Sequence, residues 1–176
     1  MLLMRALCKS CFLSSSFVFI VVIFICSGCK ESGEKKLKAT VPLELSLNPA
    51  VLSTMERSSV EVQEKKDTGT RRYEGVAVWR LLDKAGVSSG KLKHKQIAKR
   101  YLVARGADGF EVVFSLAELD TAFSSKVVIL ADKMNGKDLP ADRGPYQLIV
   151  QDDLRPTRNC YQIIKLVVYE ANPENN

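Results

Sequence analysis

The side chains best suited to chemistry in this sequence are basic, and one group of them lies between residues 91 and 105. This segment carries six lysines and arginines and no acidic residue. Such a run can bind an anionic partner, which would be a phosphate, lipid headgroups or the pyrophosphate of a cofactor. It is also typical of a solvated loop before a strand, and the pattern favours this second interpretation. The six residues are Lys91, Lys93, Lys95, Lys99, Arg100 and Arg105.

A second charged group lies in a polar stretch, residues 152–159, between two apolar segments. Loops that are held by rigid strands often carry binding sites. Arg155 and Arg158 could clamp an anion through bidentate hydrogen bonds, or they could pair with Asp152 and Asp153. Neither alternative is favoured by the sequence. Arg105, Arg155 and Arg158 are therefore our candidates for binding an anionic ligand.

Common catalytic devices are missing from the sequence. It contains no nucleotide-binding glycine motif and no HExxH, and no CxxC follows residue 29. The single histidine, His94, is flanked by lysines, whose positive charge disfavours the binding of a divalent metal. Cys160 opens the last apolar segment and is expected to be a small buried hydrophobe. We therefore expect neither hydrolase chemistry of the Ser-His-Asp or Cys-His type nor a structural zinc site.

The N-terminal 28 residues have the pattern of a secretory signal. Arg5 and Lys9 precede an uncharged stretch, residues 11–28, and small residues then lead to Cys29. This order resembles a bacterial lipobox, in which the peptide is cut before the cysteine and the thiol is lipidated. We expect residues 1–28 to be removed and Cys29 to carry the lipid. An uncleaved anchor helix and plain secretion are the alternatives.

All three interpretations place the folded domain outside the cytoplasm. Lipidation would hold it on the periplasmic face of a bacterial membrane, and Lys30 after the cysteine favours the outer membrane by resemblance to enterobacterial sorting rules. Nucleic acid is not expected as a partner, because no aromatic pattern interleaves the basic residues. The expected partners are the membrane, through the lipid on Cys29, an anionic ligand, and a redox or membrane protein.

Removal of the signal changes the composition that bears on the fold. Of 176 residues 148 remain, and the net charge falls from +6 to +4. With Cys29 lipidated, Cys160 has no partner for a disulfide within the chain. Residues 29–40 are expected to form the lipidated cysteine and a flexible tether, residues 41–170 one domain, and residues 171–176 a polar tail.

Short strands dominate the pattern of the expected domain. The spacing of Val78, Leu81, Leu82 and Ala85 predicts a helix over residues 75–86, and Ser115 begins a capping box for a second, short helix. The pattern favours an α+β fold that is mostly β, with mixed or antiparallel layered sheets and a few short helices. Strands are predicted at 41–47, 59–63, 101–105, 110–114, 127–131, 146–150 and 161–169, and turns at 48–49, 64–72, 106–109 and 135–136.

Four stretches, taken together in order and spacing, resemble a known family. They are residues 73–86, 107–120, 130–140 and 144–158. They resemble the oxidoreductase molybdopterin-binding domain, the sulfite-oxidase-type fold, and in particular its short stand-alone bacterial members. The resemblance extends over residues 41–169 and implies a mostly β fold with layered sheets.

The resemblance also implies a cofactor chemistry that this sequence only partly supports. In full-length enzymes of the family, a pterin dithiolene and one protein cysteine hold molybdenum. That cysteine lies in the strand that corresponds here to residues 59–63, where the sequence reads Ser-Val-Glu-Val-Gln. No cysteine occurs between residues 30 and 159, and Cys160 falls in another part of the pattern. The resemblance therefore allows molybdopterin as a cofactor and argues against molybdenum.

Three hypotheses on function follow. The leading one is a lipid-anchored, extracytoplasmic binding or accessory module, in an electron-transfer or redox system, without molybdenum catalysis of its own. The second is a molybdopterin-dependent oxidoreductase acting on a small oxyanion or sulfoxide, with Arg105, Arg155 and Arg158 holding cofactor or substrate. The third is a structural domain that recruits protein partners through its sheet or through residues 91–105.

Overall fold

The computed structural model describes residues 41–63, 69–151 and 153–171. The expected signal peptide, the expected tether and most of the expected polar tail therefore lie outside the described residues. In the described part no helix is both long and apolar enough to cross a membrane.

Four strands form the first sheet, called sheet A. Tyr101 lies opposite Ser115 on one side and opposite Tyr169 on the other, and each pairing in the sheet is antiparallel. The predicted hairpin turn over residues 106–109 is confirmed, and Gly109 there has a φ of 83°, a backbone region that favours glycine. In spatial order the strands are β1 (Leu43–Glu44), β9 (Ile163–Glu170), β4 (Arg100–Gly106) and β5 (Glu111–Ser115).

Sheet B is also antiparallel and contains the remaining strands. The hairpin connection predicted over residues 64–72 is confirmed, but it is shorter than predicted, because the second strand, which was not predicted, already begins at Thr70; residues 64–68 lie outside the described residues. Asn135 and Gly136 form the next turn, with φ values of 51° and 76°. The order is β2 (Arg57–Gln63), β3 (Thr70–Ala77), β6 (Val128–Met134) and β7 (Lys137–Asp138), with β8 (Gln147–Val150) also paired to β6.

The helices are short and lie in the connections between strands. The prediction of a turn at Asn48-Pro49 is wrong, because Asn48 caps a helix that has Pro49 at its first position. The Asn48 side chain accepts a hydrogen bond from the Ala50 N–H at 2.9 Å, which satisfies a donor that the helix leaves free. The helices are α1 (Pro49–Leu52), α2 (Val78–Lys84), α3 (His94–Ala98), α4 (Leu116–Leu119) and the 3₁₀ turn η1 (Pro156–Arg158).

The helix predicted over residues 75–86 begins later than expected. Strand β3 continues to Ala77, because the segment from Gly75 pairs with β6, with Val76 opposite Leu130. The helix was predicted from the spacing of apolar residues, but the pairing of residues 75–77 with β6 holds them in a strand instead. The end of the helix is as predicted, since Gly86 has a φ of 76° and follows the last turn.

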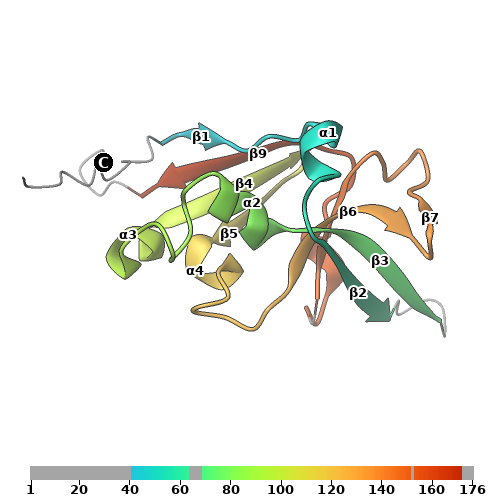
Figure 1. Ribbon diagram of the computed structural model, residues 1–176. Coiled ribbons are helices and arrows are strands. Elements are labelled where there is room, and N and C mark those ends of the chain that lie inside the picture. Colours follow the sequence, from blue (N-terminus) through green and yellow to red (C-terminus); the bar gives the residue numbers. More distant parts are fainter. Residues whose placement is uncertain (1–40, 64–68, 152, 172–176) are drawn as a thin grey trace, which may run out of the picture. The chain divides into compact units, whose positions relative to one another are not determined.

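Two apolar clusters lie on opposite faces of sheet B. The larger one contains the inward residues of sheet A, the buried faces of α2 and α4, and residues such as Leu130 and Leu148 from one face of sheet B. The smaller one lies on the other face and contains Val60, Tyr73 and Ile149. Figure 1 shows α3 and α4 near the end of sheet A where β9 finishes. The predicted mostly β fold with layered, antiparallel sheets and few short helices is confirmed.

Candidate functional site

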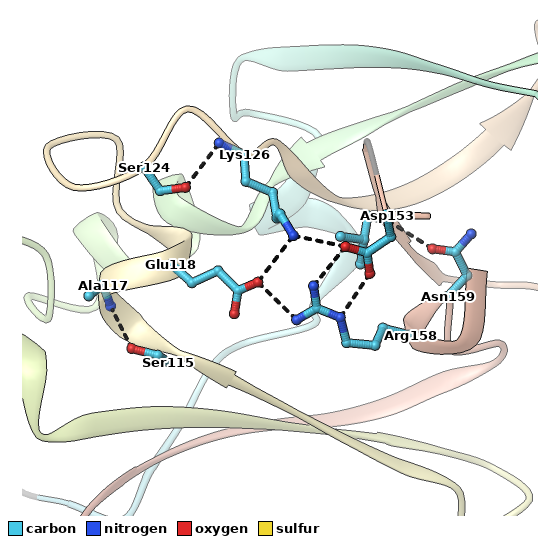
Figure 2. A network of polar contacts seen from close by, with 9 residues as sticks. Ser115, Ala117, Glu118, Ser124, Lys126, Asp153, Arg158 and Asn159 are labelled. Atoms are coloured by element: carbon cyan, nitrogen blue, oxygen red, sulfur yellow. Dashed lines mark hydrogen bonds and ion pairs between the residues drawn. The ribbon is translucent and has the colours of Figure 1, made fainter. Parts of the chain in front are cut away.

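Four charged side chains, contributed by α4, η1 and two loops, meet in one network (Figure 2). Arg158 donates from Nε to Oδ2 and from Nη2 to Oδ1 of Asp153, both at 2.8 Å. Its Nη1 donates to Oε1 of Glu118 at 2.9 Å. Lys126 completes the network, with Nζ 2.8 Å from Oδ1 of Asp153 and 3.5 Å from Oε1 of Glu118.

The charges in this network are balanced, with two cations and two carboxylates. The bidentate bond from Arg158 holds the pKa of Asp153 below its ordinary value, against the opposing effect of burial. The bond to Asp153 in turn raises the pKa of Lys126 and that of Arg158. Asp153, Lys126 and Arg158 are therefore held in their charged forms. The network is a structural cross-link between α4 and the loop that follows β8.

Of the two roles left open for Arg158, the structure shows pairing with an aspartate of the same loop. The guanidinium carbon also lies 4.8 Å from the ring centre of Phe114, which gives a cation–π contact. Asp152, the other aspartate considered, lies outside the described residues. The positive charge of Arg158 is thus already paired with carboxylates of the same chain, which makes Arg158 a poor candidate for binding an external anion.

Glu118 and Lys126 were missed by the sequence reasoning. Ser115 caps α4 as predicted, accepting a hydrogen bond from the Ala117 N–H at 3.2 Å. Glu118 does not complete the predicted capping box. Its side chain accepts a hydrogen bond from Arg158 and pairs with Lys126 instead. No helical spacing indicates this, since Lys126 lies eight residues after Glu118 and Arg158 lies 40 residues after it.

The other two candidate arginines lie elsewhere. Arg105 is exposed on the outer face of sheet A, where its Nε donates to Oε1 of Glu111 at 2.6 Å. Arg155 is exposed and stands directly before η1. Phe114, under Arg158, faces the core of sheet A, whereas Arg105 and Glu111 face outward. The structure therefore does not bring the three candidate arginines together in one anion site.

Strand β2 carries the position at which the resemblance implies a metal-ligating cysteine. Val60 is 2% exposed and packs in the smaller apolar cluster, with Val62 against it. Val62 lies opposite Arg71, six residues before Ala77 along β3. The loop after β8 begins near the Ala77 end of β3, since the Gln151 N–H donates to the Val127 carbonyl. At about 3.3 Å per residue, the six residues of β3 separate Val62 from the start of that loop by about 20 Å along the strand.

Cys160 is buried, as predicted, and belongs to the larger cluster on the other face of sheet B. It is 1% exposed, and its Sγ lies 3.8 Å from the carbonyl oxygens of Phe110 and Tyr161. Burial raises its pKa, which keeps it a neutral thiol. It does not open the last strand as expected, because β9 begins at Ile163.

Polar groups surround the smaller cluster. Arg143 donates to the Tyr73 hydroxyl at 3.1 Å, and its guanidinium lies 5.2 Å from the ring centre of Tyr161. Gln147, the first residue of β8, is 1% exposed, and its Oε1 has no hydrogen-bond partner within the part of the chain that the structure describes. The sequence signal for Gln147 was weak: it is a polar residue inside an otherwise apolar predicted strand.

The donors on these two faces do not fit a molybdenum centre. Binding would need a deprotonated thiolate on β2, and Val60 and Val62 offer none, while Cys160 is a buried neutral thiol on the opposite face. Within residues 41–63, 69–151 and 153–171 no three His, Cys, Asp or Glu side chains are grouped so that they could hold a metal ion.

The two antiparallel sheets with few short helices are consistent with the class of sulfite-oxidase-type domains. The family described as the oxidoreductase molybdopterin binding domain matches residues 35–154. The chain therefore belongs to this family, whose domains bind molybdopterin. The match ends before Arg155 and Arg158, so these two candidates lie outside the matched segment. A comparison with curated proteins gives no match.

Proposed function

We propose that this protein is a lipid-anchored, extracytoplasmic binding or accessory module of a redox system, built on the molybdopterin-binding fold but without molybdenum of its own. One observation carries the proposal. The chain has the family's fold, yet β2 presents Val60 and Val62 on its buried side, where the resemblance implies a thiolate ligand. A valine side chain has no lone pair to give to a metal.

Membrane attachment is proposed from the order of residues at the N-terminus. Two basic residues, an uncharged stretch and small residues lead to Cys29, and this order resembles a lipobox. Lys30 supports the outer membrane as the destination. The partners would then be the membrane and a redox or membrane protein beside it.

Processing at Cys29 tests the anchor. The protein purified from membranes should begin at Cys29 and carry the mass of a diacylglyceryl group, whereas Cys29→Ser should keep residues 1–28 and lack the lipid. Intact-protein mass spectrometry distinguishes the two. A wild-type chain that keeps residues 1–28, or that is cut without gaining lipid, would contradict the proposed anchor.

Independence from the cofactor can be tested through stability. A cofactor that binds only the folded state raises the free energy of unfolding, and the increase grows with the logarithm of its concentration divided by its Kd. We expect the full chain to unfold at the same urea concentration whether it is produced in a host that makes molybdopterin or in one that cannot. A higher midpoint in the competent host, together with a pterin fluorescence spectrum after denaturation, would favour a cofactor-binding enzyme instead.

A further inference from the structure

The basic segment between residues 91 and 105, noted in the sequence, is divided by the fold into two parts with different roles. Arg100 is buried and its Nε lies 3.0 Å from Oε2 of Glu170, and Lys99 pairs with the same carboxylate. Arg105 pairs with Glu111 on the outer face of sheet A. The lysines that remain, around α3, are exposed: Lys91, Lys93 and Lys95.

An exposed aromatic side chain stands among these lysines. Phe123 follows α4 and is 43% exposed, and its ring meets the exposed ring of His94 edge to face, with centroids 5.1 Å apart. We call this surface the basic end, and it consists of Lys91, Lys93, His94, Lys95 and Phe123.

The acidic side chains beside the basic end are already engaged. Asp120 is 6% exposed and accepts hydrogen bonds from the N–H and hydroxyl of Ser89 at 2.7 and 2.8 Å. Asp83 accepts from the Ser88 hydroxyl at 2.6 Å. Residues 84–107 contain no acidic residue at all. Every charged side chain within residues 84–107 is therefore basic.

The basic end lies where the chain enters the domain. Leu43 in β1 pairs with Val168 in β9, so that Val41 continues beside the end of β9. At this same end of sheet A the Ala171 N–H donates to the Lys99 carbonyl, directly after α3. Ser115, directly before α4, pairs here with Tyr101. Figure 1 shows the start of β1, the end of β9 and α3 at one end of the sheet.

The length of chain before Val41 sets how far the domain can stand from a membrane. Cys29 precedes Val41 by twelve residues. At a maximum of about 3.5 Å per residue, the domain entry lies within about 40 Å of a lipid at Cys29. Such a tether raises the effective concentration of the basic end at the bilayer surface. Lysines near an anionic leaflet and an aromatic ring at headgroup depth both favour the bound state.

We propose that the basic end docks on anionic phospholipid headgroups, with Phe123 at the level of the interface and the lysines around it facing the charged surface. The proposal rests on the proposed anchor for its geometry. It fixes the orientation of the domain, with the β2–β3 hairpin of sheet B directed away from the bilayer and free to meet a partner.

The test uses the full chain in vesicles and reports on position 123 directly. Trp79 is the only tryptophan, so Phe123→Trp in a Trp79→Phe background gives a single fluorophore. The vesicles contain phosphatidylcholine with brominated acyl chains, alone or mixed with phosphatidylglycerol. We expect bromine quenching of the tryptophan in the mixed vesicles and not in phosphatidylcholine alone. At about 1 M salt, where the screening length is about 3 Å, the quenching should vanish.

Charge reversal supplies the matched control. Each lysine near an anionic surface contributes about a fivefold preference for binding. Lys91→Glu with Lys95→Glu should therefore lower the ratio of docked to free domain at least about 25-fold. Lys133→Glu with Lys137→Glu, on β6 and β7 of sheet B, changes the net charge equally and should leave the quenching unchanged.

The outcomes separate this inference from the anchor. Equal quenching in both kinds of vesicle, equal loss in both double variants, or no quenching in an anchored protein would overturn the docking. Docking that needs another membrane protein in the vesicles would overturn it as well. A chain that does not float with phosphatidylcholine vesicles lacks the anchor, and flotation restored by phosphatidylglycerol would then still support the basic end as a lipid-binding surface.

Discussion

At the scale of single residues, Arg158 is the clearest case of a side chain whose role depends on its partners. From the sequence it could bind an external anion or an aspartate of its own loop. The structure gives it Asp153 and Glu118, with hydrogen bonds of 2.8 to 2.9 Å. Asp153 is 12% exposed, so removing its main partner would leave a carboxylate that water compensates only in part.

We therefore expect Arg158→Ala to lower the free energy of unfolding by about 2 kcal/mol. Urea unfolding of the full chain at neutral pH measures this. Arg155→Ala is the matched control, because Arg155 is exposed and its loss should change the free energy of unfolding by less than about 0.5 kcal/mol. Equal effects of the two substitutions would contradict the network.

The same network predicts a dependence on pH. Because Arg158 holds the pKa of Asp153 below its unfolded value, the network contributes its full stability above the unfolded value of about 3.9. That contribution is lost as the pH falls from there through the lower pKa of the folded state. In Arg158→Ala the loss of stability below about pH 4 should be smaller than in the wild type. Unfolding midpoints across this pH range provide the measurement, and parallel curves would argue against the assignment.

Cys160 gives a second prediction at this scale. It is 1% exposed and burial raises its pKa, so the reactive thiolate is both rare and inaccessible. Iodoacetamide should label Cys160 in urea and leave it unmodified in the folded protein, as read by peptide mass spectrometry. Rapid labelling of the folded chain would mean that this part of the core opens or that the thiol is ionised.

At the scale of elements, sequence patterns predicted most strands and missed boundaries set by pairing. The turn residues Gly109 and Asn135-Gly136 are local signals, and the hairpin predicted at the first and the turn predicted at the second are present. The continuation of β3 to Ala77 is not local, because it comes from pairing with β6 about 50 residues later. The bond from Arg158 to Glu118, 40 residues away, was beyond prediction for the same reason, whereas pairing with Asp153 of the same loop was one of the two expected roles.

Gly75 tests how closely β3 and β6 approach. A Cβ at this position would lie 2.0 Å from the Leu130 carbonyl oxygen and 2.6 Å from the Ala131 Cα, both of them backbone atoms. Gly75→Ala should therefore lower the free energy of unfolding by more than about 3 kcal/mol or prevent folding. At Gly90 a Cβ would find its nearest atoms at 3.8 and 3.9 Å, so Gly90→Ala should change it by less than about 1 kcal/mol. Similar urea midpoints for the two variants would rule out this close contact.

At the scale of the whole molecule, sheet B separates the one described cysteine from the strand on which the resemblance implies a metal-ligating thiolate. Cys160 lies in the cluster on one face of the sheet, and Val60 and Val62 of β2 lie in the cluster on the other face. Of the candidate arginines, Arg105 lies on sheet A, Arg155 directly before η1, and Arg158 in η1 within the network of Figure 2. The family's fold could be predicted from four sequence stretches, whereas the dispersal of these residues depends on how two sheets pack.

The metal content of the full chain tests the central claim most directly. The protein should be purified from a host that makes the molybdenum cofactor, beside a family member that has the ligand cysteine, and both analysed for molybdenum by mass spectrometry and for pterin by fluorescence. We predict that molybdenum stays at background level in this protein. The control should contain about one molybdenum atom per chain, as expected for a single site. Stoichiometric molybdenum with a pterin spectrum in this protein would contradict the account.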